Sequence, residues 1–260
     1  MSFQTPKEVF LSVVNSGKLK VQTNTSKLLL QSFFAGAYIA FGGFLALKIG
    51  GGIPEIKSSN PGLASLIFGG VFPVGLVLVI MTGAELFTGN TFLLIPALRH
   101  KEIKLIDIAK NWSFSFLGNF IGSLFVAYFF VHITQLLGKS PWHDTVTSLA
   151  VAKVNQPFVV LFWKAVACNW LVCLAIWLSI ASKQLSGKIL GIWLPIMAFV
   201  ALGFEHSVAN MFFIPLGIFE GAEVSWVDFL IDNLLPVTLG NILGGAAFVG
   251  LAYSYIFKEK

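Results

Sequence analysis

Two short polar motifs interrupt the apolar stretches of this chain. One covers residues 83–92 and the other residues 203–212, and both read Gly-x-Glu-x-x-x-x-Asn-x-Phe. The second motif contains His206. An ionisable side chain in apolar surroundings is costly and usually marks a functional site. Because histidine changes its charge near neutral pH, His206 is a candidate for proton transfer; a neutral histidine that holds two helices together is the alternative.

The glutamates and asparagines occupy matching places in the two motifs. We predict that they are structural and accept hydrogen bonds from N–H groups of the interrupted backbone, because they pair between the two motifs and such N–H groups need acceptors. These four residues are Glu85, Asn90, Glu205 and Asn210. Neither a second histidine nor a cluster of carboxylates accompanies His206. We therefore predict no catalytic residue, metal site or cofactor, and an enzyme is not expected.

The composition is that of a membrane protein. Of the 260 residues, 56% are hydrophobic and 11% are charged, and the mean hydropathy is +0.83; soluble domains have about 25% charged residues. Six apolar stretches exceed the roughly 20 residues that a transmembrane helix needs. They cover residues 28–50, 63–98, 109–137, 157–182, 187–217 and 229–257. We predict an all-α membrane protein with six spans, in which Cys168 and Cys173 are buried apolar filler.

The basic residues predict the orientation in the membrane. Most of the 17 lysines and arginines lie in an N-terminal arm at 1–27, in the loop at 99–110, near Lys183, and in a tail at 258–260. By the positive-inside rule, both termini are expected in the cytoplasm, with a multi-pass channel domain at 28–257 in the cell (plasma or inner) membrane. Because the basic residues sort by loop and not by face, no nucleic-acid partner is predicted. The arm is predicted to be an interfacial helix on anionic lipid, with a lid over the cytoplasmic mouth as the alternative.

The chain contains an internal repeat. Besides the two polar motifs, residues 111–122 and 233–244 share an Asn, a Gly-Asn pair and a final Gly at the same spacing. Matching blocks about 120 residues apart indicate a duplication, and three spans in each half (28–137 and 157–257) make the halves inverted. Four glycines of these blocks are predicted to be helix contacts: Gly118, Gly122, Gly240 and Gly244.

The polar motifs fall within the second and fifth apolar stretches, which we therefore predict to be broken helices. Paired interruptions point to a transport site, because each creates a half-helix whose free N–H groups and positive dipole end face the middle of the membrane. Two such ends suit a small anion. Kinks that only help the helices to pack are the alternative.

Four segments closely resemble the formate/nitrite transporter family. They read Leu-Phe-Thr-Gly-Asn (86–90), Cys-Asn-Trp-Leu-Val-Cys (168–173), Gly-Phe-Glu-His-Ser-Val-Ala-Asn-Met (203–211) and Asn-Leu-Leu-Pro-Val-Thr-Leu-Gly-Asn (233–241). The resemblance implies an aquaporin-like fold and a homopentamer in membrane lipid, in which every protomer has its own pore for a small monovalent anion and protons. The start of the sixth stretch looks more like the formate branch, with nitrite or hydrosulfide as alternatives. Paired Asn-Pro-Ala motifs are absent, so a water or glycerol channel is less favoured.

Carried over position by position, the resemblance implies the residues of the pathway. His206 becomes the central pore histidine, Thr88 its hydroxyl partner, and Lys153 the lysine of a vestibule. Asn169 and Asn241 are expected to line the pore. Leu86 and Phe199 are expected to form a constriction on one side of the histidine, with Phe72 beside them. Leu76 shares a helix face with Phe72 and is expected at the same gate. The apolar constriction set is Phe72, Leu76, Leu86, Phe87 and Phe199.

These residues imply a proton-linked mechanism. Burying a bare anion costs far more than burying a neutral acid. The anion is therefore expected to concentrate near Lys153, and then to accept a proton near His206 or to be stabilised there by hydrogen bonds. From the residues alone, Lys153 and Lys164 either draw anions in by their field or extend to the membrane interface.

Overall fold

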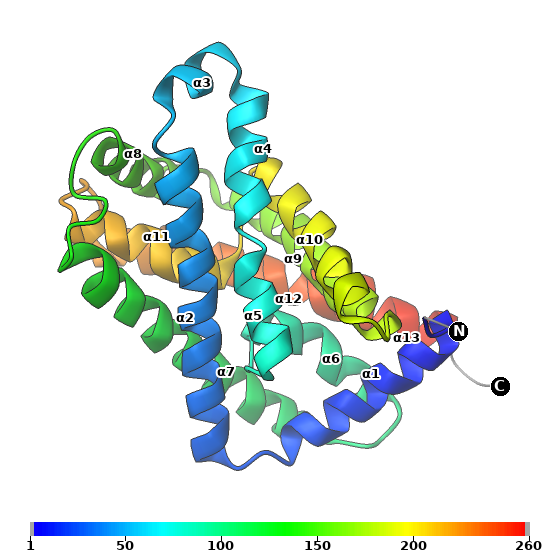
Figure 1. Cartoon of the computed structure of the whole chain (residues 1–260). Helices are drawn as coiled ribbons and strands as arrows, with labels where there is room; N and C mark the ends of the chain where they lie inside the picture. Colours follow the sequence, from blue (N-terminus) through cyan, green and yellow to red (C-terminus); the bar gives the residue numbers. More distant parts are fainter. Residues whose placement is uncertain (1–2, 258–260) are drawn as a thin grey trace.

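A computed structural model describes residues 3–257, and the predicted tail at 258–260 lies outside them. The described chain is built of helices (Figure 1). In chain order these are α1 (Pro6–Val21), α2 (Thr25–Gly50), α3 (Pro54–Ser59), α4 (Pro61–Val71), α5 (Val74–Thr82), α6 (Phe87–Arg99), α7 (Leu105–Phe125), the π-helical η1 (Val126–His132), α8 (Trp142–Val154), α9 (Phe158–Ala181), α10 (Leu185–Ala201), α11 (Ser207–Phe219), η2 (Asp228–Leu234), α12 (Leu235–Gly245), η3 (Ala246–Leu251) and α13 (Ala252–Ile256).

Within residues 3–257, five helices are long and apolar enough to cross a membrane. They are α2, the α4–α5 pair (Pro61–Thr82), α7 with η1 (Leu105–His132), α9, and the rod from η2 to α13 (Asp228–Ile256). The apolar stretch predicted at 187–217 holds two shorter helices, α10 and α11. Helix α8 lies outside every predicted apolar stretch.

Two glycines open the two polar loops in the same way. Gly83 follows α5 with φ +73°, and Gly203 lies after α10 with φ +70°; glycine adopts this left-handed region without steric cost. The N–H after each glycine bonds to the carbonyl oxygen five positions earlier, at 2.9 and 3.0 Å. Helices α6 and α11 begin four residues after each glycine. The loops therefore share one geometry, which matches the repeated motif.

Helices α6 and α11 form the buried centre of the protein. Every residue at 87–97 and at 207–217 is buried. The longer helices pack around them, α2 against α7 and α9 against α12. The first turns of α6 and α11, and the loops that precede them, therefore lie away from lipid and inside the protein.

Two helix pairs bring their backbones into contact at glycines. A Cβ at Gly122 of α7 would collide with the carbonyl oxygen of Phe33 on α2. In the same way, a Cβ at Gly244 of α12 would collide with the carbonyl oxygen of Val166 on α9. The predicted role of these glycines in helix contacts is confirmed.

Replacing Gly122 by alanine is expected to destabilise the protein by about 1–3 kcal/mol, because an added methyl group must be forced into a packed contact. Gly70 on α4 is the matched control, since a Cβ there meets nothing within 4 Å and alanine favours a helix. The thermal unfolding midpoint in detergent should fall for Gly122→Ala and stay or rise for Gly70→Ala. Equal midpoints for the two variants would contradict a close contact between α2 and α7.

Helix α1, predicted to be an interfacial helix, packs one face on the protein. It starts at a capping box formed by Thr5 and Glu8, and it contacts α6, α7 and α9. Figure 1 shows it crossing the end of the molecule opposite α3. Four of its apolar side chains are buried: Val9, Phe10, Val13 and Val14. The buried apolar side chains of α1 are thus covered by protein, and its position fits the alternative of a lid; Leu11 and Leu19 stay exposed, so the contact with lipid stays a prediction.

Candidate functional site

The two polar loops meet at a hydrogen bond between His206 and Thr88. His206 immediately precedes α11, and Thr88 lies in the first turn of α6. The His206 Nε2 and Thr88 Oγ1 atoms are 2.9 Å apart, and both residues are buried. Because each stands at the start of a half-length helix, two helix N-termini with positive dipole ends come together here. The structure thus joins the two residues that the resemblance pairs.

The backbone determines which nitrogen of His206 carries the proton. The Ala209 N–H donates to Nδ1 over 3.1 Å, so Nδ1 is an acceptor. In the neutral ring the proton therefore lies on Nε2, which donates to the Thr88 hydroxyl oxygen. The Phe199 ring stacks on the imidazole, with centroids 5.8 Å apart, and limits its rotation. The Thr88 hydroxyl hydrogen has no acceptor in residues 3–257, so it is free to donate to a bound anion.

An asparagine of the neighbouring helix holds each polar loop in place. The Asn241 Oδ1 atom accepts the N–H of Ser207 (2.8 Å), and its Nδ2 donates to the carbonyl oxygens of Ala165 (2.9 Å) and Glu205 (3.0 Å). Asn241 is fully buried. The expectation that it lines the pore is wrong, because its polar atoms are all used to fix the loop.

Asn119 does the same for the other loop. Its Oδ1 accepts the N–H of Phe87 (2.9 Å), and its Nδ2 donates to the carbonyl oxygens of Ser32 (2.7 Å) and Glu85 (2.9 Å). Sequence reasoning gave Asn119 no role. The signal was present, because the Gly-Asn pairs at 118–119 and 240–241 occupy equivalent places in the repeat.

Asn169 braces the contact between the two halves. Its Nδ2 donates to the carbonyl oxygen of Thr88 (3.1 Å), to Thr91 Oγ1 (2.9 Å) and to the carbonyl oxygen of Asn241 (2.6 Å). Asn169 has no exposed surface and lines neither cavity beside the histidine. The Nδ2 atom of Asn169 is therefore structural, while its Oδ1 atom has no partner in the described residues and its place in the pore wall stays a prediction. Cys168 and Cys173 are buried beside it, as predicted.

Glu205 binds side chains, whereas a role as acceptor of loop N–H groups was predicted. Its two carboxylate oxygens lie 3.0 and 2.9 Å from Lys153 Nζ. Asn210 Nδ2 donates to Glu205 (2.6 Å) and also to Asn233 Oδ1 (2.8 Å). Asn210 is thus a donor and not an acceptor. The group forms a buried ion pair held by asparagines.

Glu85 forms the equivalent group in the first half. Its Oε1 lies 2.6 Å from Lys20 Nζ of α1, and Asn90 Nδ2 donates to its Oε2 (2.8 Å) and to Asn111 Oδ1 (2.9 Å). The predicted acceptor role of Glu85 and Asn90 toward loop N–H groups is corrected in the same way. Lys20 was not singled out from the sequence, because it lies outside the repeat.

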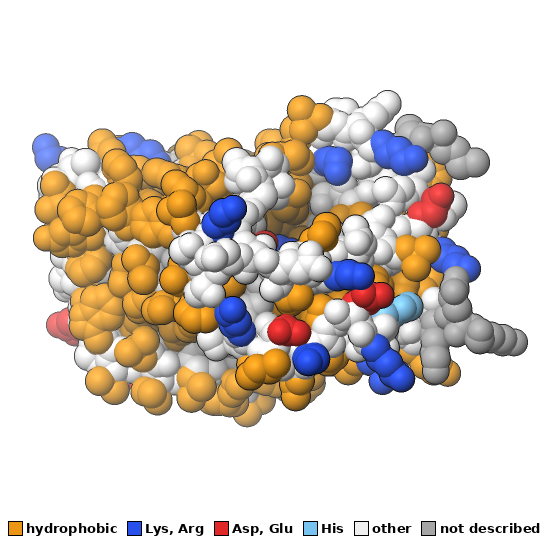
Figure 2. Space-filling model, turned by 90° about the horizontal axis from the view of Figure 1, so that it is seen from below, with side chains coloured by type: hydrophobic (Ala, Val, Ile, Leu, Met, Phe, Trp, Pro, Cys, Tyr) orange, Lys and Arg blue, Asp and Glu red, His pale blue; other side chains and the backbone are white. Residues whose placement is uncertain are grey.

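The end of the molecule that carries α1 is rich in basic side chains. Figure 2 looks onto this end and shows lysine and arginine side chains spread across it. Lys18 of α1 lies 2.7 Å from Glu102 in the loop after α6, and its hydrogen bond lowers the pKa of that carboxyl group. The ion pairs of Lys18 and Lys20 therefore attach α1 to the rest of the protein.

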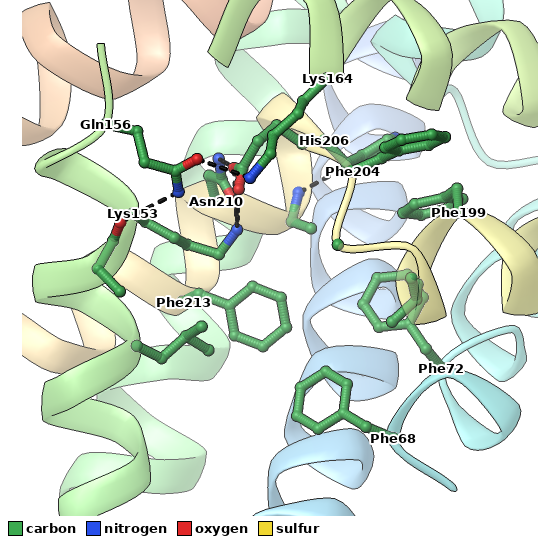
Figure 3. Close-up of a pocket in the computed structure, with 16 residues that line it drawn as sticks. Phe68, Phe72, Lys153, Gln156, Lys164, Phe199, Phe204, His206, Asn210 and Phe213 are labelled. Atoms are coloured by element: carbon green, nitrogen blue, oxygen red, sulfur yellow. Dashed lines mark hydrogen bonds and ion pairs between the residues drawn. The ribbon is translucent and has the colours of Figure 1, made fainter. Parts of the chain in front are cut away.

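Two cavities flank the His206–Thr88 contact. The first, the Lys153 cavity, has a volume of about 240 Å³ and is lined by Lys153, Glu205 and His206 among others. The second, the Lys20 cavity, has a similar volume and is lined by Lys20, Glu85 and Gly89 among others. Figure 3 shows the Lys153 cavity with its polar side chains gathered on one wall and phenylalanine rings on the others. Each cavity thus pairs a lysine and a glutamate.

The apolar residues expected at the constriction divide between the two cavities. Phe72 and Phe199 line the Lys153 cavity, whereas Leu76 and Leu86 line the Lys20 cavity. The expectations that Leu86 and Phe199 lie on one side, and that Phe72 and Leu76 share a gate, are therefore wrong. Phe72 lies in the turn between α4 (Pro61–Val71) and α5 (Val74–Thr82), whereas Leu76 lies within α5, so the two side chains do not share the face of one continuous helix.

Phe87 does not belong to the constriction. Its ring lies edge-on against Phe116 and Trp112, with centroids 5.1 and 6.3 Å apart. It lines neither cavity. Its side chain therefore packs against α7.

Comparison with known proteins places the chain in a family. The formate/nitrite transporter family model matches residues 7–255. A probable formate transporter of Methanothermobacter thermautotrophicus is 46% identical, over 100% of this chain and 99% of the relative. A solved structure described as an FNT family ion channel has a TM-score of 0.88 at 35% identity, covering 96% of this chain and 98% of that chain. A pentameric formate channel with formate bound has a TM-score of 0.79 at 29% identity, covering 90% and 98%. This multi-pass membrane protein therefore belongs to the formate/nitrite transporter family, a family of transporters and channels and not of enzymes.

Proposed function

We propose that the chain conducts formate across the cell membrane, linked to a proton, along a path through the Lys153 cavity, the His206–Thr88 contact and the Lys20 cavity. The observation that carries this proposal is the His206–Thr88 hydrogen bond between two helix N-termini, with a lysine-containing cavity on each side. Two positive helix ends and a free hydroxyl hydrogen suit a small anion.

The proposed architecture has six spans in two inverted halves, 28–137 and 157–257, with an aquaporin-like arrangement. The second span comprises α4, α5 and the half-helix α6, and the fifth comprises α10 and the half-helix α11. Three mirrored features support this: the two glycine-opened loops, the two asparagine braces, and the two lysine–glutamate–asparagine groups. The similarity to a pentameric formate channel supports a homopentamer.

The proposed orientation places the N-terminal arm (1–27) in the cytoplasm and the 28–257 channel domain in the membrane. The end that carries α1 is rich in basic side chains, which supports a cytoplasmic location. The Lys20 cavity then opens inward, beneath α1, and the Lys153 cavity opens outward.

Formate is the proposed substrate because two proteins that match nearly the whole chain, the probable formate transporter and the pentameric formate channel, are named for it. The central contact offers one hydroxyl and one imidazole between apolar rings, which suits a small carboxylate. Nitrite and hydrosulfide share its charge and are treated as competing substrates in the test below.

The proposed proton path follows from the hydrogen bonds of His206. A proton from water in the Lys153 cavity adds to Nδ1 and displaces the Ala209 N–H. The charged ring then gives its Nε2 proton to the Thr88 oxygen while the Thr88 hydroxyl proton passes to the carboxylate. The ring returns to the neutral form, the anion becomes the acid, and exchange with water restores the Nε2–H. The acid crosses the apolar barrier, because a neutral molecule loses far less hydration energy than an ion.

The test is uptake of formate, nitrite and hydrosulfide into proteoliposomes at two external pH values, with glycerol as the neutral solute. We expect formate uptake to be the fastest and to rise as external pH falls, since the proton is a co-substrate. If nitrite or hydrosulfide were taken up faster than formate, the assignment of formate as the substrate would be overturned. Uptake of glycerol without any anion would overturn the anion proposal itself.

A further inference from the structure

Two lysines line the Lys153 cavity, and they have partners of different charge. Lys153 binds both oxygens of Glu205, at 2.9 and 3.0 Å, so the pair has no net charge. Lys164, near the start of α9, instead places its Nζ atom 2.7 Å from Gln156 Oε1. Within residues 3–257 Lys164 forms no ion pair. The cavity is therefore left with one uncompensated positive charge.

The amide of Gln156 is fixed by its own hydrogen bond. Its Nε2 donates to the Ala152 carbonyl oxygen in the last turn of α8 over 3.1 Å. Because the amide nitrogen is used there, the amide oxygen must face Lys164. Figure 3 shows Gln156 and Lys164 joined in this way at the polar wall of the cavity. Gln156 thus holds Lys164 over the cavity, whereas an unheld lysine would extend toward the membrane interface.

We propose that Lys164, positioned by Gln156, supplies the electrostatic attraction that brings an anion into the Lys153 cavity, and that the Lys153–Glu205 pair does not. The charged residues that line this cavity are Lys153, Lys164 and Glu205. A cation in a low-dielectric cleft raises the local concentration of anions. This inference rests on the proposed function, because it concerns how that anion enters.

Four variants test the role of Lys164. Lys164→Gln removes the charge. Gln156→Glu keeps the lysine but gives it a carboxylate partner, which can no longer donate to the Ala152 carbonyl oxygen. Lys164→Arg keeps the charge. Lys139→Gln is the matched control, because it removes a lysine from the exposed loop between η1 and α8 that does not line the cavity. All four are compared with the parent protein in proteoliposomes, at equal protein content and with equal unfolding midpoints in detergent.

The measurement is formate uptake against external formate concentration, at low and at high ionic strength. Lys164→Gln and Gln156→Glu should both raise the concentration for half-maximal uptake, roughly three- to tenfold at low salt, and the difference should shrink at high salt. Lys164→Arg and Lys139→Gln should behave like the parent. If the parent transports formate but Lys164→Gln matches Lys139→Gln, Lys164 has no such role while the proposed function stands. A parent protein that transports no anion would instead overturn the proposed function.

Discussion

Replacing Lys153 by methionine is expected to lower the free energy of unfolding by about 3–5 kcal/mol and to abolish anion uptake. The Glu205 side chain is only 4% exposed, and removing one partner of a buried ion pair leaves an uncompensated charge. The amide of Asn210 would remain within 2.6 Å of the carboxylate, but it carries no charge to offset it. The bare carboxylate would also stand one residue before His206, where it would repel the anion.

The double variant Lys153→Met/Glu205→Gln identifies the cause of that loss. Glutamine keeps an oxygen that accepts from Asn210, so the double variant should recover most of the stability that Lys153→Met loses. Glu205→Gln alone should cost less than Lys153→Met, because a lysine ammonium on its long, flexible stem can turn toward water. Unfolding in detergent and uptake into proteoliposomes measure both effects. A double variant no more stable than Lys153→Met would mean that lost packing, and not the unpaired charge, is responsible.

The internal repeat made the central site predictable. Motifs at the same offset in both halves located the two loops, and the resemblance paired His206 with Thr88, whose atoms lie 2.9 Å apart. The glycine spacing identified the contact positions on α7 and α12, and the structure supplies their partners, α2 and α9. Each of these features depends on residue types at fixed short spacings, which a sequence shows directly.

The partners of the polar side chains were not predictable in the same way. Glu205 takes its cation from α8, and Glu85 takes its cation from α1, 65 positions earlier in the chain. The residue type alone does not show whether an asparagine lines a pore or braces a loop. Asn169 and Asn241 were therefore placed in the pore by the resemblance. Only the three-dimensional arrangement distinguishes the two roles.

Helix α1 shows a second limit. Its apolar residues Val9, Phe10, Val13 and Val14 form the one-sided pattern of an amphipathic helix. Either lipid or protein can cover such an apolar face, so the sequence pattern alone does not show which of the two α1 contacts. The choice depends on the surface of α6 that receives α1 and on the ion pair between Lys20 and Glu85.

Replacing His206 by asparagine is expected to lower the rate of formate uptake at least tenfold, which corresponds to a transport barrier higher by about 1.4 kcal/mol. The increase in uptake at low external pH should also become weaker. Asparagine is a good N-cap residue, so its side-chain oxygen can accept the Ala209 N–H that His206 Nδ1 accepts now. The fold is therefore kept while the titrating ring and its Nε2–H are lost. Uptake against external pH measures the effect, and an unchanged pH profile would remove the proton path through His206.

Thr88 provides the test that separates a relay from a merely structural bond. Thr88→Val removes the hydroxyl group at nearly constant shape, and Thr88→Ser keeps it. If the proton passes from Nε2 through the Thr88 oxygen, losing either group breaks the same path. The Thr88→Val/His206→Asn double variant should then be no slower than the slower single variant, whereas independent roles would make the two losses multiply. Thr88→Ser should retain both the rate and the pH dependence, because its hydroxyl can still accept from Nε2 and donate to the anion.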